Sequence, residues 1–237
     1  MRLDKYIADT GIASRREIAK AARAGKVSVN GAAVRDASVH IDENTARVVY
    51  CGSEVRREQY TYAMLNKPRG YISSTEKGGH TVMALLPEEF SKMDMFPCGR
   101  LDIDTVGLLL ITNNGPLAHE LLSPRRHAEK TYFFRCDPPI GDDEAKKLEA
   151  GIDIGGYVTK KCRVEYDEEG RSGHITLTEG KFHQIKRMFQ AVGSSIVYLQ
   201  RTAFANLTLD PTLGEGEWRL LTAEEIEGLM TAHAEKP

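Results

Sequence analysis

The sequence has few of the features that mark secreted, membrane-spanning or metal-binding proteins. It contains only four cysteines, and no two of them form a Cys-x-x-Cys pair, the spacing typical of zinc and thioredoxin-like sites. No two of the seven histidines have the His-Glu-x-x-His or His-x-x-x-His spacing that places two imidazoles on one face of a helix. We therefore expect reduced thiols and no bound metal.

Long hydrophobic runs are also missing. The longest one, Val106 to Ile111, is interrupted by Gly107 and is far shorter than the roughly 20 residues that a membrane-spanning helix needs. The charged start Met1-Arg2-Leu3-Asp4-Lys5 leads into no apolar segment of the kind found in a secretory signal. These absences predict a cytoplasmic protein with no membrane partner.

Neither common nucleotide-binding pattern occurs. The chain has no Gly-x-Gly-x-x-Gly loop and no Gly-x-x-x-x-Gly-Lys-Ser/Thr loop, whose backbone amides would cradle a phosphate group. Nothing in the sequence therefore supports dependence on ATP or NAD, and we expect no cofactor.

The composition is that of a folded protein. The chain has 237 residues, 41% hydrophobic and 28% charged, which excludes a disordered or fibrous class and allows one large domain or a small and a large one. Its formal net charge of -2 hides a basic N-terminus, because seven cations and only three carboxylates occur in the first 30 residues. The seven cations are Arg2, Lys5, Arg15, Arg16, Lys20, Arg23 and Lys26.

A cationic helix is predicted in this basic segment. Ser14-Arg15-Arg16-Glu17 fits a capping box, in which the side chains of the first and last residue each accept a bond from the other's amide. With 3.6 residues per turn, Arg16, Lys20 and Arg23 fall on one stripe. The opposite face holds Ile18, Ala21 and Ala22. The charge pattern alone allows either a solvated surface or a face that binds nucleic acid.

The helix is followed by signals for a turn and then for a linker. Gly25 is a plausible end of the helix, and Val27-Ser28-Val29 runs into Asn30-Gly31, a strong signal for a tight hairpin. The charged segment Cys51–Gln59 is a candidate linker. We therefore expect a first domain over residues 1–58 and a second over 60–237.

The second domain mixes strands and helices without a regular alternation. Strands are predicted at Tyr60–Leu65, Gly107–Thr112, Thr131–Cys136, Arg163–Tyr166, His174–Thr178 and Ile196–Ala203. Helices are predicted at Pro116–Leu122, Asp142–Ala150, His183–Val192 and Thr222–His233. This pattern favours an α+β fold with a largely antiparallel sheet over a doubly wound one.

Four stretches concentrate polar residues around glycine or proline. They are Leu65–Gly70 (LNKPRG), Gly99–Leu109 (GRLDIDTVGLL), Glu129–Tyr132 (EKTY) and Glu179–Met188 (EGKFHQIKRM). Two close carboxylates, Asp102 and Asp104, could serve a glycosidase or an aspartic protease. On an extended backbone, however, they share a face and cannot by themselves attack a sugar from opposite sides. Capping of a turn or pairing with Arg100 is an equally open role for them.

In this order, the four stretches resemble the RsuA family of bacterial ribosomal-RNA pseudouridine synthases. The segment from Met1 to about Asp42 resembles the RNA-binding module named after ribosomal protein S-four, at Arg2–Lys5, Ser14–Arg16 and Gly25–Gly31. In that module the cationic helix and the following hairpin face structured RNA, where lysine and arginine neutralise phosphates. The resemblance implies that the seven N-terminal cations bind RNA.

The resemblance also assigns roles to residues of the second domain. It puts the catalytic nucleophile at Asp102, with Asp104 as a supporting residue, and implies that Tyr132 packs on the target base. Lys186 takes the position of the basic residue that pairs with the catalytic carboxylate, and Arg187 is the alternative. Arg100, beside the nucleophile, could fill the space left by an extruded uridine or hold a phosphate. Considered singly, Tyr132 could be a core residue, and Lys186 and Arg187 a solvated helix stripe.

The function implied is the isomerisation of a uridine to pseudouridine in ribosomal RNA, with small-subunit 16S rRNA, free or in an assembly intermediate, as the expected partner. Large-subunit 23S rRNA is the main alternative, because enzymes for both subunits share the motifs. Two other classes are a non-catalytic RNA-binding assembly factor and a glycoside hydrolase. A monomer is the expectation from the family.

Overall fold

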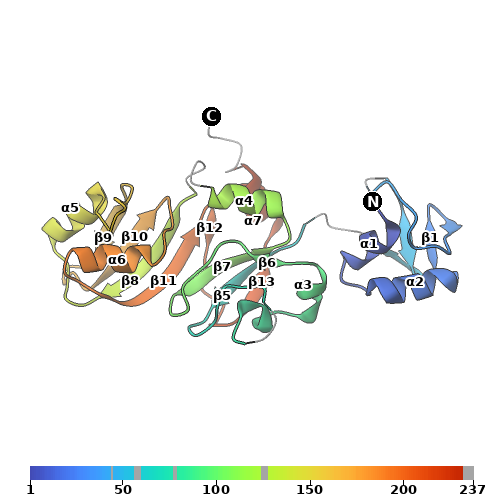
Figure 1. The fold of residues 1–237 in the computed structure, drawn as a ribbon, viewed down its shortest axis with the longest axis horizontal. Helices are drawn as coiled ribbons and strands as arrows, with labels where there is room; N and C mark the ends of the chain where they lie inside the picture. Colours follow the sequence, from blue (N-terminus) through green and yellow to red (C-terminus); the bar gives the residue numbers. More distant parts are fainter. Residues whose placement is uncertain (44, 56–59, 77–78, 124–127, 232–237) are drawn as a thin grey trace. The chain divides into compact units, whose positions relative to one another are not determined.

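The computed structural model describes residues 1–43, 45–55, 60–76, 79–123 and 128–231 (Figure 1). The chain divides into two compact units. The first comprises Met1–Thr61 with Leu86–Phe96, and the second comprises Tyr62–Leu85 with Pro97–Pro237. Within the described ranges, none of the helices has the length and apolar character needed to cross a membrane.

The N-terminal part of the first unit packs two helices against a small antiparallel sheet. The helices are α1 (Leu3–Ala8) and α2 (Arg15–Arg23). The strands are β1 (Val27–Val29), β2 (Ala32–Ala33), β3 (Val48–Tyr50) and β4 (Ser53–Val55), in the order β2-β1-β3-β4. Their shared core includes the fully buried Leu3, Ile7, Ile18 and Val48.

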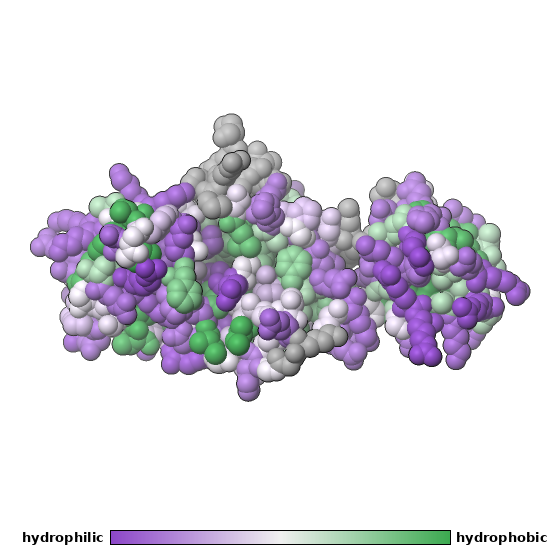
Figure 2. All heavy atoms as spheres, viewed as in Figure 1, coloured by the Kyte–Doolittle hydropathy of each residue, from purple (hydrophilic) through white to green (hydrophobic). Residues whose placement is uncertain are grey.

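The predicted capping box and hairpin are confirmed. The Ser14 hydroxyl accepts from the Glu17 amide at 3.4 Å, and the Glu17 carboxylate accepts from the Ser14 amide at 2.8 Å. Asn30 and Gly31 have φ values of 51° and 84°, which suit the two central positions of a type I′ turn. On α2 the side chains of the predicted cationic stripe, Arg16, Lys20 and Arg23, are exposed. The opposite face, Ile18, Ala21 and Ala22, is buried. The visible face of this part is mostly hydrophilic (Figure 2).

The prediction of a linker beginning at Cys51 is wrong. Cys51 and Gly52 form the turn of a hairpin, and Ser53–Val55 pairs with β3 in the register Val48 to Val55. The charges of the segment suggested a linker, but Val55 is only 3% exposed and completes the core of this part. The rest of the expected linker, residues 56–59, lies outside the described residues.

The second unit is built on a mixed sheet that has nine strands in the described residues. The main path runs β13-β5-β7-β11-β8-β10-β9, with β12 paired to β11 and β6 to β7. The strand bounds are β5 Tyr62–Lys67, β6 Phe96–Pro97, β7 Val106–Thr112, β8 Lys130–Cys136, β9 Arg163–Tyr166, β10 Ser172–Leu177, β11 Ile196–Phe204, β12 Leu207–Thr208 and β13 Trp218–Leu220. An α+β fold with a largely antiparallel sheet is confirmed.

The second unit also contains the 3-10 turn η1 (Val82–Leu85) and the helices α4 (Gly115–Leu122), α5 (Asp142–Ala150), α6 (Gln184–Ala191) and α7 (Ala223–Thr231). Helix α3 (Glu88–Lys92) belongs to the first unit. Helix α6 packs on the sheet through Phe189, whose ring centroid lies 4.8 Å from that of Phe134 in β8. The bounds predicted for β9 and α5 are confirmed, and the other predicted elements are confirmed with ends shifted by at most two residues. The predicted end of the last helix, His233, lies outside the described residues.

Strands β7 and β11 pair in parallel, whereas the other pairs along the main path of this sheet are antiparallel. Their register places Gly107 opposite Arg201. Gly107 has a φ of +99°, and a Cβ built on it would lie 2.4 Å from the backbone oxygen of Arg201. The approach of the two strands therefore depends on the missing side chain, and it holds the loop before β7 close to β11.

We predict that Gly107→Ala lowers the free energy of unfolding by at least about 2 kcal/mol, because it adds a clash with backbone to an unfavourable φ. Gly193→Ala is the matched control, since Gly193 has a φ of +84° with nothing within 4 Å of its built Cβ. That control should lose only about 1 kcal/mol. Urea unfolding of both variants tests this, and equal losses would show that the close approach to Arg201 is not limiting.

Candidate active site

Strand β5 supports the loop that carries Asp102 and Asp104. Lys67, at the end of β5, is fully buried and its Nζ donates to the backbone oxygens of Thr105 at 2.8 Å, Pro68 at 3.1 Å and Ile103 at 3.4 Å. Burial lowers the pKa of Lys67 to about 8, although the charges of Asp104 and Asp102 oppose this shift. One buried amine thus contacts three backbone oxygens in and beside this loop.

Ser73 and Gly70 hold the same loop from its other side. The Ser73 hydroxyl accepts from the Leu101 amide at 3.1 Å, and the Gly70 amide donates to the Ile103 oxygen at 2.7 Å. The backbone amide of Thr105 also donates to the backbone oxygen of Asp102 at 3.1 Å. Together these bonds fix the backbone that carries the two aspartates.

Lys186 of helix α6 connects both aspartates. Its Nζ lies 3.0 Å from Oδ2 of Asp102 and 2.5 Å from Oδ1 of Asp104. Partial burial opposes the charge on Lys186, but its bonds to the two carboxylates outweigh this and raise its pKa. Burial likewise favours neutral Asp104, but the hydrogen bond from Lys186 and the charge of Lys186 together outweigh it and lower the pKa of that carboxyl. Lys186 and Asp104 are therefore both charged at neutral pH.

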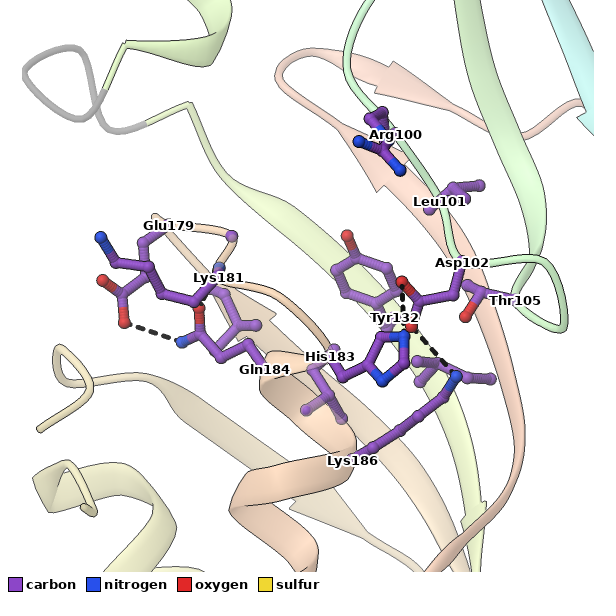
Figure 3. A pocket seen from close by; sticks show the side chains of 14 residues that line it. Arg100, Leu101, Asp102, Thr105, Tyr132, Glu179, Lys181, His183, Gln184 and Lys186 are labelled. Atoms are coloured by element: carbon purple, nitrogen blue, oxygen red, sulfur yellow. Dashed lines mark hydrogen bonds and ion pairs between the residues drawn. The ribbon is translucent and has the colours of Figure 1, made fainter. Parts of the chain in front are cut away.

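A small cavity opens beside these charges. Its volume is about 90 Å³, and it is lined by Asp102, Lys186, Tyr132, Arg100 and His183 among others (Figure 3). Tyr132 comes from β8 and is 9% exposed, with its ring next to the Asp102 carboxylate in the close-up view. Three segments distant in the sequence thus bring a carboxylate, an amine and an aromatic ring to one cavity.

The structure separates Lys186 from its predicted alternative. The Arg187 guanidinium donates to the backbone oxygen of Ile154, and Arg187 does not line the cavity. Lys186, rather than Arg187, therefore pairs with the carboxylates. Arg100 lines the cavity and is exposed at its mouth.

The N-terminal cations predicted to bind RNA are all exposed. They are Arg2, Lys5, Arg15, Arg16, Lys20, Arg23 and Lys26. Arg2 forms an ion pair with Asp4 at 2.8 Å, and the hydrogen bond to Asp4 raises the pKa of Arg2.

His183 is a site residue for which the sequence suggested no role. It precedes α6 with a left-handed φ of 49°, which explains why the helix begins one residue later than predicted. Its Nε2 lies 3.8 Å from Oδ1 of Asp102, and its ring stacks on that of the exposed Phe182 with centroids 3.8 Å apart. The sequence signal for it was its place in the fourth polar stretch. Its left-handed backbone conformation, rare outside glycine, is visible only in the structure.

A polar network fixes the start of helix α6. The side-chain Nε2 of Gln184 donates to the Glu179 carboxylate at 2.7 Å. This carboxylate also accepts from the Tyr157 hydroxyl at 2.6 Å and from the backbone amide of Lys160 at 2.9 Å. Burial opposes the charge of Glu179, but these bonds outweigh it and lower the pKa of this carboxyl. The network orients the helix that presents Lys186.

Known proteins share both the sequence pattern and the fold. Residues 61–191 match the sequence model of the RNA pseudouridylate synthase family, and residues 1–46 match that of the S4 domain. A protein of Bacillus subtilis (strain 168) named as an uncharacterized RNA pseudouridine synthase is 43% identical over 99% of this chain and 100% of its own. Ribosomal small subunit pseudouridine synthase A of Escherichia coli (strain K12) is 37% identical over 97% of this chain and 100% of its own.

A solved structure described as a pseudouridylate synthase is also similar, with a TM-score of 0.67 and 34% identity over 97% of this chain and 99% of the other. The chain therefore belongs to the RNA pseudouridylate synthase family, as an RsuA-type pseudouridine synthase with an N-terminal S4 domain. The resemblance seen in the sequence is confirmed, and the protein is an isomerase.

The bracing of the loop by Lys67 gives a prediction. Lys67→Met removes the donor to three backbone oxygens, so the aspartates lose their fixed position and turnover at saturating RNA should fall by roughly 10²-fold. RNA affinity should stay near that of wild type, because Lys67 is fully buried. Tritium release from RNA with 5-tritiated uridine and filter binding measure the two quantities. Lys146→Met, an exposed lysine of α5, is the control, and unchanged turnover in Lys67→Met would refute the bracing role.

Proposed function

We propose that this enzyme converts a uridine of small-subunit ribosomal RNA to pseudouridine, with Asp102 as the catalytic carboxylate. The observation that carries the proposal is the contact of Lys186 with Asp102 and Asp104 beside the Tyr132 ring. The name of the Escherichia coli relative supports the small subunit as substrate. We place the enzyme in the cytoplasm as part of the same proposal, because bacterial ribosomes are assembled there.

The reaction needs a carboxylate near the sugar. Isomerisation breaks the C1′–N1 bond, turns the base and joins C1′ to C5, with no redox change. Asp102 serves as nucleophile at C1′ or as base at C2′. Lys186 holds and aims this carboxylate through the contact of its Nζ with Oδ2 of Asp102 at 3.0 Å. In this proposal Asp104 shares the lysine and supports the loop.

Tyr132 and Arg100 are proposed to hold the nucleotide. An aromatic ring can stack on the uracil while the base turns, an interaction worth about 1–3 kcal/mol. The target uridine must leave its stack to reach the cavity, and the exposed Arg100 at the mouth is placed to hold a phosphate or fill the vacated space. A monomer as the active form, the expectation from the family, is part of the same proposal.

Two other classes fit the geometry less well. A glycoside hydrolase that uses two carboxylates needs them on opposite faces of a sugar, whereas Lys186 contacts both Asp102 and Asp104. A non-catalytic assembly factor has no use for an ion pair in a cavity beside an aromatic ring. The exposed cations of α2 and its neighbours suit the RNA backbone in either case.

Mapping of the product tests the substrate. Purified enzyme is incubated with unmodified 16S and 23S rRNA, free and in assembly intermediates, and pseudouridine is located by carbodiimide adducts and primer extension. We expect a new stop in 16S rRNA. A stop in 23S rRNA alone would overturn the small-subunit assignment and leave the chemistry intact.

Asp102→Asn should reduce activity to background while folding and RNA affinity stay close to wild type, because the amide is nearly isosteric and lacks the charge. Lys186→Met should also be severe, and adding it to Asp102→Asn should cost nothing further, as for members of one catalytic unit. Asp104→Asn is the matched control and should lose only part of the rate. Tritium release measures all four. Wild-type-like rates in Asp102→Asn would make Asp104 the next candidate.

The exposed stripe of α2 gives a prediction for binding. Replacing Arg16, Lys20 and Arg23 by Ala should weaken RNA binding and flatten its salt dependence by roughly 0.7–0.9 log units of slope per lost phosphate contact. Turnover on saturating RNA should change little, because the stripe belongs to the first unit. Binding titrations between low and high salt measure the slope, and an unchanged slope would show that the stripe is only a solvated surface.

A further inference from the structure

A second, larger cavity is also lined by Tyr132. Its volume is about 360 Å³, and it shares Tyr132, Arg100 and Glu179 with the cavity that holds Asp102. Its walls also include Lys130 and Arg201. The proposed function assigns no role to this cavity or to these two cations.

Lys130 and Arg201 are buried cations without a carboxylate partner among the described residues. Lys130 is 8% exposed and its Nζ donates to the Ala128 oxygen at 3.0 Å. Arg201 is 1% exposed, and its Nε donates to the Leu108 oxygen at 2.7 Å. Its Nη2 has no hydrogen-bond partner in the described part of the chain. Burial, together with the charge of Arg201, lowers the pKa of Lys130 to about 8.

The sheet brings both cations next to Tyr132. Lys130 and Tyr132 are two residues apart on β8, so their side chains share a face. Arg201 of β11 lies directly opposite Tyr132, and an irregularity after Arg201 places Phe204 opposite Lys130. Both cations therefore lie over the Phe204 ring, at 5.5 Å for Lys130 and 5.1 Å for Arg201.

Burial of these two cations costs free energy unless an anion binds beside them. Two like charges with few polar contacts are held in a region of low dielectric constant, where an unpaired charge is strongly disfavoured. The Glu179 carboxylate in the same wall is already occupied by Tyr157, Lys160 and Gln184. A negatively charged guest is the partner that would balance these cations.

The proposed reaction produces such an anion. Whether Asp102 forms a bond to C1′ or takes the proton from C2′, the C1′–N1 bond breaks and its electron pair leaves with N1. The uracil is then a monoanion, whose charge spreads over N1 and the carbonyl oxygens. C5 then bonds to C1′, which breaks the bond between Asp102 and C1′ in the first case, or is accompanied by return of the proton from Asp102 to C2′ in the second. Transfer of the C5 proton to N1 completes the isomerisation.

We propose that this second cavity is the chamber in which the detached uracil turns, and that Lys130 and Arg201 bind its carbonyl oxygens and stabilise the anion. The inference rests on the proposed roles of Asp102 and Tyr132. A base suits the chamber better than a backbone phosphate, because the two cations are buried and a phosphate stays between two sugars of the continuous chain. Lys130 and Arg201 would then be catalytic residues that act on the leaving group.

The test compares leaving groups in single turnovers at saturating RNA. The substrates are an RNA fragment with uridine at the target position and the same fragment with 5-fluorouridine, in which fluorine itself stabilises the uracil anion. Lys130→Met should slow the conversion of uridine by about 10²-fold, as for loss of one electrostatic donor to a developing anion. The loss should be much smaller with 5-fluorouridine, followed as disappearance of that nucleoside from digested RNA.

Controls separate this role from folding and from RNA binding. Lys147→Met, an exposed lysine of α5, should match wild type, and Lys130→Arg should retain most of the rate because it keeps the charge. The melting temperature of Lys130→Met should equal or exceed that of wild type, since a buried charge is removed. Lys130→Gln gives the same readout if the Met variant does not fold.

Three results would overturn the proposal. Equal losses with the two substrates would exclude an action on the leaving group. Weaker binding with a flatter salt dependence and an unchanged single-turnover rate would identify a phosphate site instead. Wild-type rates in a folded Lys130→Met or Lys130→Gln would exclude a catalytic role. Asp102→Asn is assayed in parallel, and its activity, rather than that of the Lys130 variants, decides the proposed function.

Discussion

The contact of Lys186 with Asp102 and Asp104 is the interaction on which the site depends. It joins helix α6 to a loop more than 80 residues earlier in the chain, so both partners must be positioned independently. Lys67 fixes the loop through three backbone oxygens. The bond between Gln184 and Glu179 fixes the start of the helix. The ion pair is thus held in place from both ends before any substrate binds, which is the preorganisation that catalysis needs.

Buried cations surround this centre. Lys67, Lys130 and Arg201 are each less than a tenth exposed, and burial lowers the pKa of both lysines to about 8. Such groups contribute little to stability and are retained where a site requires them. Lys67 binds the backbone of the loop that carries Asp102 and Asp104, whereas Lys130 and Arg201 have few partners among the described residues. Binding of the proposed uracil anion would explain why Lys130 and Arg201 are buried without a carboxylate partner among the described residues.

The two units differ in how they expose or bury positive charge. The S4 domain exposes the seven cations of its first 30 residues, while its apolar residues form a separate core. The second unit buries Lys67, Lys130 and Arg201, while other cations such as Arg100 are exposed. The overall charge of -2 therefore says little about RNA binding, because an average over the chain hides the basic N-terminus.

Local patterns in the sequence were sufficient for the elements that depend on neighbours along the chain. The Ser14 capping box, the Asn30-Gly31 turn and helix α5 follow from hydrogen bonds and periodicity within a few residues, and the motifs pointed to Asp102 and Lys186. The tertiary structure decided the rest. Whether Lys186 or Arg187 meets the carboxylates depends on how α6 packs, and the role of Val55 depends on a core formed by distant residues. The pairing of Gly107 with Arg201, the bracing by Lys67 and the buried cations behind Tyr132 all arise from contacts across the sheet, whose partners no local pattern specifies.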